Sequence, residues 1–331
     1  MDNIDYSKKI GLAILLTIML TGCSADSGET VSPTEQTATA ETTDDAAGQQ
    51  APAIVEAGDQ QFKIFSYHEA FSQYVALAKE EQDSRDLVYS EMIFQPFRQN
   101  AFHDGGGSEF EDLGVFNPPQ NGLSMQSTLD ALAGKNEDFQ SAIEKALIKS
   151  AELLPGGDKT VHIFPATPAD GSGMALNAEV MILWVHPTLS AEELEQTVAH
   201  EYFHLIDMEK GVFESATADS TLLEATIMEG KAVAFALLNY PETDLSWLSN
   251  EDGKVTEQVH NLFLEQKDSY DLQVWGDFLN GNPAKGIPPY ANYIIGHEIM
   301  QSFLLNHPGL SVDEWLKMTA EEILQGSGYG E

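Results

Sequence analysis

Hydrophobic positions along the chain follow two different periods, which predicts helices on either side of a short region of strands. Helical spacing runs through residues 66–100, interpreted as two helices, and through residues 137–154. Residues 161–164 and 180–185 are instead β-branched and aromatic runs bounded by Gly and Pro. We therefore expect two strands there, joined by a loop at 169–173.

The C-terminal half is predicted to be helical. Ser190-Ala191-Glu192-Glu193 fits a capping box and should begin a helix that ends at Gly211. Further helices are expected from Asp219 or Ser220 to about Asn239, and at 254–266, 291–306 and 311–324. The pattern predicts an α+β fold, mostly helical, with a small sheet beside the helix that begins after Ser190.

The N-terminus carries the features of a secretion signal over residues 1–22. Lys8 and Lys9 precede an apolar run at 10–20, which is shorter than the roughly 20 residues that a membrane-spanning helix needs. The sequence Leu20-Thr21-Gly22-Cys23 resembles the bacterial lipobox, in which the cysteine is lipidated and becomes the mature N-terminus. We expect Cys23 to anchor the protein to the cell membrane, facing the extracytoplasmic side. A chance cysteine after an ordinary signal is the alternative.

Composition separates a tether from a folded domain. Residues 24–58 are dominated by small and polar residues and lack aromatic side chains, which predicts a disordered tether at 23–58 and a folded domain at 59–331. The domain is long enough for one core or for two closely packed lobes. A net charge of −37 excludes nucleic acid as an expected partner, because polyanion binding needs clustered Lys and Arg.

The chemistry is concentrated in an HExxH motif, the HEYFH segment at 200–204. Two histidines four residues apart on a helix share one face, so His200 and His204 can bind one Zn²⁺. Glu201 can reach the open side of that ion and take a proton from a bound water. The alternative is that the two histidines merely pack or are solvated. The other histidines have no partner at ligand spacing and are expected to be structural or solvated: His68, His103, His162, His186, His260 and His307.

A catalytic zinc site needs a third protein ligand and an exchangeable position. The next predicted helix offers Glu224 and Glu229. Five residues along a helix correspond to a rotation of about 140°, so one carboxylate at most should face the metal. The neighbouring apolar residues do not decide between them.

A resemblance bears on that choice. The HEYFH segment, followed by residues 221–223 (Thr-Leu-Leu) and by Glu229-Gly230-x-Ala232, resembles a bacterial family of predicted zinc-dependent proteases known mainly as a domain of unknown function. At this point it is also similar to the gluzincin aminopeptidases. The resemblance covers roughly residues 161–305 and includes Tyr293-Ile294-Ile295-Gly296. Lys231 stands where a leucine is expected.

The resemblance implies a zincin-like fold, hydrolysis of peptide or protein substrates, and Glu229 as the third zinc ligand. In such a fold the strand at 180–185 would form the sheet edge where an extended peptide adds. Its nearly unbroken apolar character fits an interior strand equally well. An oxyanion donor could come from Tyr290, Tyr293 or His297, of which Tyr293 and His297 are the candidates we retain.

Two other functions share these residues. A non-catalytic surface lipoprotein would hold a structural zinc with a fourth protein ligand, for which Asp207, Glu209 or Glu224 is available. A zinc hydrolase that cleaves a non-peptide bond of the cell envelope would use the same site as a peptidase. The sequence does not indicate an oligomeric state or a cleavage specificity.

Overall fold

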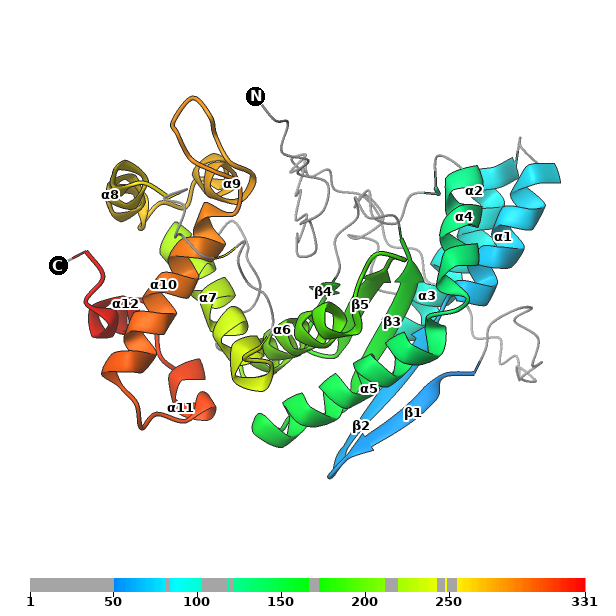
Figure 1. Cartoon of the computed structure of the whole chain (residues 1–331), viewed down its shortest axis with the longest axis horizontal. Coiled ribbons are helices and arrows are strands. Elements are labelled where there is room, and N and C mark those ends of the chain that lie inside the picture. Colours follow the sequence, from blue (N-terminus) through cyan, green and yellow to red (C-terminus); the bar gives the residue numbers. More distant parts are fainter. Residues whose placement is uncertain are drawn as a thin grey trace, which may run out of the picture.

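The computed structural model describes residues 51–80, 84–102, 118–119, 122–166, 173–211, 220–242, 248 and 255–330. Helices predominate in this part of the chain, and they surround one five-stranded mixed sheet (Figure 1). The predicted α+β class is confirmed. The signal segment, Cys23 and most of the predicted tether lie outside the described residues.

The sheet consists of β1 (Ala53–Ala57), β2 (Gln60–Ser66), β3 (Lys159–Pro165), β4 (Gly173–Ala175) and β5 (Val180–Val185), in the order β1-β2-β3-β5-β4. Strands β2, β3 and β5 are parallel, and β1 and β4 pair antiparallel at the two edges. Every residue of β5 is buried. The expectation that 180–185 forms the sheet edge is therefore wrong, and the interior alternative holds because β3 and β4 flank it.

Strand β1 corrects the predicted boundary of the tether at residue 58. Residues Ala53–Ala57 pair with β2 across a turn at Gly58, whose φ of 63° suits glycine. Their burial alternates along the strand. The folded part therefore begins earlier than predicted. The prediction missed this strand because averaging the composition over a long polar segment hides an alternation of only five residues.

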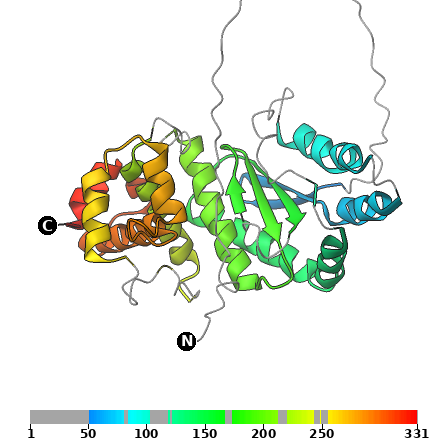
Figure 2. The same ribbon diagram turned by 90° about the horizontal axis from the view of Figure 1, so that it is seen from above.

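Helices cover both faces of the sheet. The long helices α5 (Asn136–Leu153) and α6 (Ala191–Glu209) pack on one face within the main core. The opposite face is covered by N-terminal helices in an aromatic-rich second core (Figure 2). These are α1 (His68–Glu80), α2 (Arg85–Tyr89), the π-helix η3 (Ser90–Phe94), α3 (Gln95–Ala101) and α4 (Gly122–Leu132).

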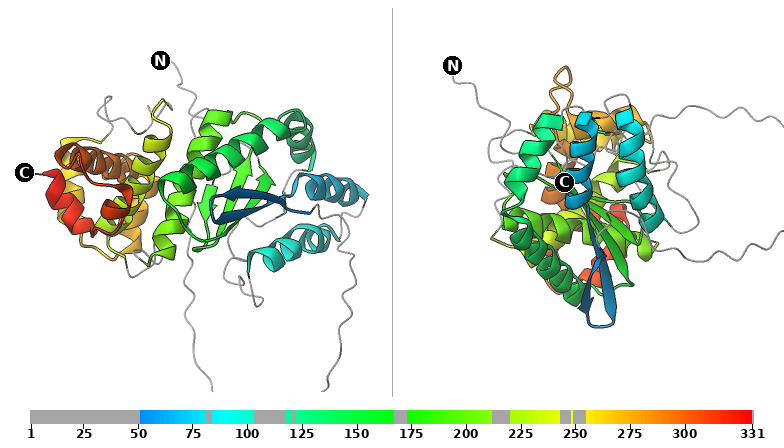
Figure 3. Two further views of the ribbon diagram at one scale, coloured as in Figure 1. Left: turned by 90° about the horizontal axis from the view of Figure 1, so that it is seen from below. Right: turned by 90° about the vertical axis from the view of Figure 1, so that its right-hand side faces the viewer.

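The remaining helices gather at the other end of the molecule, beyond α6 (Figure 3). They are α7 (Leu222–Asn239), α8 (Glu257–Gln266), α9 (Leu272–Asn280), α10 (Ala291–Asn306), α11 (Val312–Leu316) and α12 (Ala320–Ser327). The helix predicted at 311–324 is two helices, because Thr319 forms a new capping box with Glu322. The N-cap of α7 is Thr221 rather than Asp219 or Ser220. No helix in the described part of the chain is both long and apolar enough to cross a membrane.

Candidate metal centre

Helix α6 carries the HEYFH segment and is fixed at both ends. Its N-terminus has the predicted capping box, in which Ser190 Oγ accepts the Glu193 N–H at 3.1 Å and the Glu193 carboxylate accepts the Ser190 N–H at 2.8 Å. A satisfied cap of this kind stabilises a helix by about 1 kcal/mol. All residues from 197 to 207 are buried, which holds the motif in the core of the molecule.

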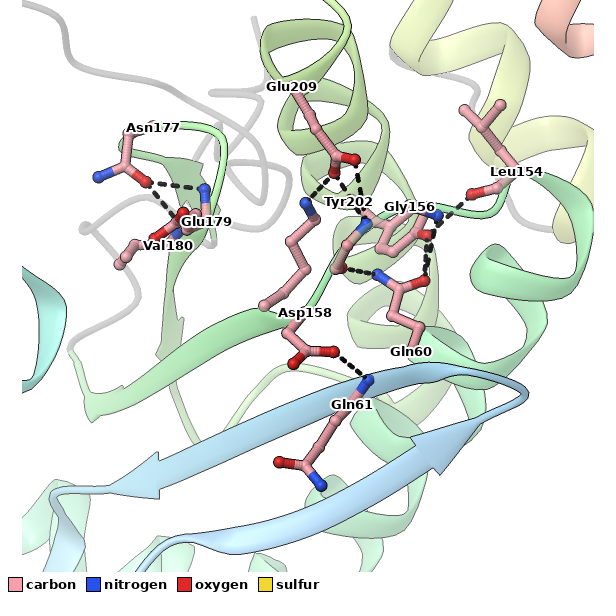
Figure 4. Close-up of polar contacts among 12 residues, drawn as sticks. Gln60, Gln61, Leu154, Gly156, Asp158, Asn177, Glu179, Val180, Tyr202 and Glu209 are labelled. Carbon is pink, nitrogen blue, oxygen red and sulfur yellow. Dashed lines mark hydrogen bonds and ion pairs between the residues drawn. The ribbon is translucent and has the colours of Figure 1, made fainter.

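The C-terminal half of α6 is held by the segment that links α5 to β3 (Figure 4). The Tyr202 hydroxyl lies 2.8 Å from Leu154 O and 2.9 Å from Gln60 Oε1. The Glu209 carboxylate accepts the Gly157 N–H and pairs with the buried ammonium of Lys159. These contacts join α6 to the first residues of β2 and β3, so the sheet sets the helix register.

Three ligand atoms converge between α6 and α7. His200 Nε2 and His204 Nε2 are 3.0 Å apart, and they lie 3.2 and 3.4 Å from Glu229 Oε2. Tetrahedral ligands at 2.0 to 2.1 Å from a zinc ion are separated by about 3.3 Å. The spacing of the ligand cluster (His200, His204 and Glu229) therefore fits one zinc ion, and two imidazoles with one carboxylate are donors that zinc accepts.

The electrostatics of the ligand cluster match a cation site. Burial would raise the pKa of Glu229, but the neighbouring His204 and His200 hold it well below its usual value. Burial would likewise lower the pKa of His204, and the Glu229 carboxylate raises it instead. The carboxylate and the imidazoles thus stabilise each other's charged forms, and a bound cation would replace the protons on the imidazoles.

Glu201 lies beside the ligand cluster and is fully buried. Its Oε2 accepts the Ala175 N–H from β4 at 2.9 Å. Its Oε1 is buried and has no hydrogen-bond donor among the described residues. Burial raises the pKa of Glu201, while His200 and His204 lower it. A carboxylate oxygen left without a donor in this position is available to a water molecule.

Strand β4 approaches α6 closely at this point, and sequence reasoning missed it. A Cβ on Gly173 would lie 2.6 Å from Glu201 Cγ and 2.8 Å from Thr197 Cγ2, so only glycine allows this approach. The strand has three residues, too few for a periodic signal in sequence.

The structure brings Glu229, and not Glu224, to the two histidines. Glu224 is the N3 residue of the α7 capping box, where its Oε2 accepts the Thr221 N–H at 2.7 Å. In the part of the chain that the structure describes, only His200, His204 and Glu229 form a group with metal-ligand spacing.

The other candidate fourth ligands have different environments. Glu209 is engaged by Lys159 and Gly157, as described above. Asp207 is buried one turn after His204, and burial raises its pKa to about 6. Since neither belongs to the ligand cluster, a zinc ion held by these three residues would keep a fourth position for water or substrate.

Tyr293 and His297 differ in their relation to the ligand cluster. The Tyr293 ring stacks on His200, with ring centroids 6.3 Å apart and an interplanar angle of 21°. His297 is partly buried one turn further along α10, and no hydrogen bond or ion pair within the described residues joins it to the cluster. Tyr290 has left-handed backbone with φ of 60° and contacts the edge of the Tyr293 ring.

A contact between two glycines explains why glycine follows Glu229 in one motif and Tyr293 in the other, as Gly230 and Gly296. A Cβ on Gly230 would lie 2.7 Å from the Gly296 carbonyl carbon, so α7 and α10 cross with their backbones in contact. Glu229 directly precedes one glycine, and Tyr293 lies one turn before the other.

Lys231, the departure from the expected leucine, donates to Leu316 O and Met318 O at 2.8 Å, which links α7 to the C-terminal helices.

A comparison with protein families agrees with this geometry. The model of a family described as Predicted Zn-dependent protease (DUF2268) matches residues 139–325, more than half of the chain. The chain belongs to this family. The resemblance inferred from the motifs is confirmed, and the matched range contains most of α5 and all of α6, α7 and α10. No curated protein and no solved structure matched the chain.

Proposed function

We propose that this member of the family is a zinc-dependent peptidase with a zincin-like active site. The observation that carries the proposal is the ligand cluster, whose three ligand atoms have the spacing of a tetrahedral zinc site. Beside them lies Glu201 Oε1, which accepts no hydrogen bond from the described residues. A zinc ion bound there would lower the pKa of a coordinated water and polarise a carbonyl group. Membership of a family described as predicted zinc-dependent proteases supports the same reaction class.

Glu201 is the general base in this proposal. The Ala175 N–H fixes Oε2 at 2.9 Å, which leaves Oε1 to accept the proton of the attacking water. Desolvation raises the pKa of this carboxyl, so the protonated form that results can donate to the leaving amine. One side chain thereby serves as base and then as acid, and no covalent intermediate is required.

The outer edge of β4 is the proposed peptide-binding edge. The Leu176 N–H donates to Val180 O at 2.8 Å, so main-chain groups at positions 174 and 176 face β5. The main-chain groups of Gly173 and Ala175 point to the opposite side, as the bond from Ala175 to Glu201 illustrates. An extended substrate pairing with this edge would lie beside the general base.

The three-ligand geometry argues against a structural zinc site. A structural site is usually closed by a fourth protein ligand. Asp207, Glu209 and Glu224 lie outside the ligand cluster in the described part of the chain. The proposal therefore commits to hydrolysis.

Metal analysis and a peptide-library digest test this function. We expect about one zinc per chain in purified protein, and cleavage by the wild type. Glu201→Gln should retain the zinc and lose cleavage, whereas the matched change Glu224→Gln at the α7 cap should retain both. Full cleavage by Glu201→Gln would contradict the mechanism, and zinc without cleavage of any library member by the wild type would contradict peptidase activity.

We further propose that the protein is anchored to the outer face of the cell membrane by a lipid on Cys23. The charged and apolar N-terminus followed by Leu-Thr-Gly-Cys supports this placement. Cys23→Ala should move the protein from the membrane pellet to the soluble fraction of fractionated cells. An unchanged distribution would contradict the lipid anchor.

A further inference from the structure

A cavity of about 490 Å³ lies on the face of the sheet that α5 covers, at the carboxyl ends of the parallel strands. Its lining includes Ser66 of β2, Pro165 of β3 and Val185 of β5, together with residues from the first halves of α1 and α5. None of the lining residues belongs to the ligand cluster. Ligand sites in proteins have volumes of roughly 300–1,000 Å³ and often lie at the carboxyl ends of parallel strands. The cavity is therefore a candidate binding site separate from the metal centre.

The lining combines an apolar floor with uncharged hydrogen-bonding groups. Phe139 and Ile143 of α5 are buried members of the main core and form part of the floor. Asn136 and Gln140, on the same helix, also line the cavity and are exposed. A side-chain amide carries both donors and an acceptor, which match the N–H and C=O groups of a peptide. This chemistry suits a peptide that places an apolar side chain on the floor.

The charge around the cavity favours a neutral or basic ligand. Among the described residues that line it, Glu69 is the one carboxylate and none is Lys or Arg. Lys135 is close in sequence, but its ammonium lies 3.4 Å from Leu189 O, outside the lining. Burial lowers the pKa of His68 more than Glu69 raises it, so this lining imidazole is neutral at pH 7. An acidic peptide would in addition be repelled by the net charge of −37.

Strand β1 supplies a sheet edge beside this cavity. In the described part of the chain it is the outer strand on the side opposite β4 (Figure 1), and its first residue, Ala53, lines the cavity. The Gln61 N–H donates to Asp158 at 2.8 Å, away from β1, so Gln61 and its partner Glu56 form a non-hydrogen-bonded pair (Figure 4). Such pairs alternate along an antiparallel ladder. The main-chain groups of Ile54 and Glu56 therefore point away from β2.

We propose that this edge and this cavity form a second peptide-binding site, which takes an extended, neutral or basic segment of a partner protein. The segment pairs with the outward main-chain groups of Ile54 and Glu56 as a further strand. Neighbouring residues of paired strands share a face, so the segment residue beside Ala53 directs its side chain to the cavity. Pro52, at the next outward position, has no N–H to donate, which keeps the paired segment short.

The experiment measures the binding of a fluorescein-labelled peptide, Lys-Thr-Val-Thr-Leu-Thr-Lys, by fluorescence anisotropy. The parent protein is the full chain carrying Glu201→Gln, so that the probe is not cleaved. As an extended strand, the probe presents Val and Leu on one face between basic ends. We expect saturable binding. Replacing Val and Leu by Ser should raise Kd by about 10-fold to 100-fold, and replacing both Lys by Glu should raise it by about 10-fold.

Two changes at Ile54 isolate the sheet edge. Ile54→Pro removes an N–H that β2 does not use, and proline is tolerated at such positions of an edge strand. It should raise Kd by about 10-fold, because a main-chain hydrogen bond is lost. Ile54→Ala, the matched control, loses the same side chain but keeps the N–H, and its Kd should stay within about 2-fold of the parent. Ala53→Phe places a ring at the cavity and should also weaken binding by about 10-fold.

Each arm has a result that would overturn the inference. Equal constants for Ile54→Pro and Ile54→Ala would contradict pairing with β1. Binding unaffected by Ala53→Phe would place the peptide away from the cavity, and a parent protein without saturable binding would have no such site. Failure of the wild type to bind zinc or to cleave peptides would contradict the proposed function and leave these binding results unchanged, because the site shares no residue with the ligand cluster.

Discussion

Gly230 and Gly296 are in backbone contact where α7 crosses α10, and this contact brings Glu229 and Tyr293 to the two histidines of α6. Added Cβ atoms at either position would meet backbone rather than flexible side chain. The helices can relieve such a contact only by separating, which would draw Glu229 away from the ligand cluster.

Gly230→Ala should therefore destabilise the protein and weaken zinc binding together. Overpacking of this kind costs about 1–3 kcal/mol. Gly276→Ala in α9 is the matched control, since its nearest neighbour, Asn280 Nδ2, is 3.9 Å away. It should stabilise the helix by about 0.5–1 kcal/mol. Denaturant unfolding with parallel zinc analysis checks both, and a Gly230→Ala protein of wild-type stability and zinc content would contradict the crossing.

Glu229 and Glu224 provide a matched pair of carboxylates on one helix. Glu229→Gln should abolish the stabilisation by zinc, which for a tight site at 1,000 times Kd amounts to about 4 kcal/mol. Glu224→Gln should preserve that stabilisation, because glutamine also serves at N3 of a capping box. Thermal unfolding at increasing zinc concentration checks this. A zinc-dependent Tm in Glu229→Gln but not in Glu224→Gln would reverse the assignment.

Local signals in the sequence predicted the helices that carry the site. The capping box at Ser190, the four-residue spacing of the histidines and the glycine stop at 211 are all contained in α6 or its ends. The strands β3 and β5 and the helices α5 and α10 also follow from local periodicity. The motif after Glu229 predicted which carboxylate approaches the histidines, but only through family resemblance.

The missed features depend on contacts between distant segments. Strand β4 pairs with β5, and its close approach to α6 depends on Gly173 meeting Glu201, which lies 28 residues further along the chain. Strand β1 is only five residues long and follows a polar segment, and pairing with β2 decides its conformation. The approach of Tyr293 to His200 requires the crossing of α7 and α10, which no single segment encodes.

Gly173→Ala tests the approach of β4 to Glu201, the proposed general base. The new methyl group would lie 2.6 Å from Glu201 Cγ and should displace the carboxylate from its bond to the Ala175 N–H. Misplacement of a catalytic group by about 1 Å costs about 10² in rate. We expect kcat to fall by that factor with zinc content unchanged. Gly134→Ala is the control, because a Cβ added at Gly134 has no neighbouring atom within 4 Å. Equal kcat values for the two variants would contradict the role of β4.

His162, which lies outside the metal centre, should make the free energy of unfolding depend on pH. It is fully buried between Phe65 and Phe97, and burial lowers its pKa to about 3 from a usual value of 6.5. The unfolded chain therefore takes up a proton between pH 6.5 and 3 that the folded protein does not. Its contribution is constant above pH 6.5, and stability falls by about 1.4 kcal/mol per unit as pH drops below it.

His162→Phe should remove this slope, whatever its effect on stability at neutral pH. Tyr67→Phe, which loses the contact to His162 Nδ1 but keeps the imidazole, should retain it. The free energy of unfolding, measured in denaturant at several pH values between 4 and 7, checks the pair. Because other groups titrate in this range, the decisive quantity is the difference in slope between His162→Phe and wild type. A difference near zero would mean that the buried imidazole gains its proton without unfolding.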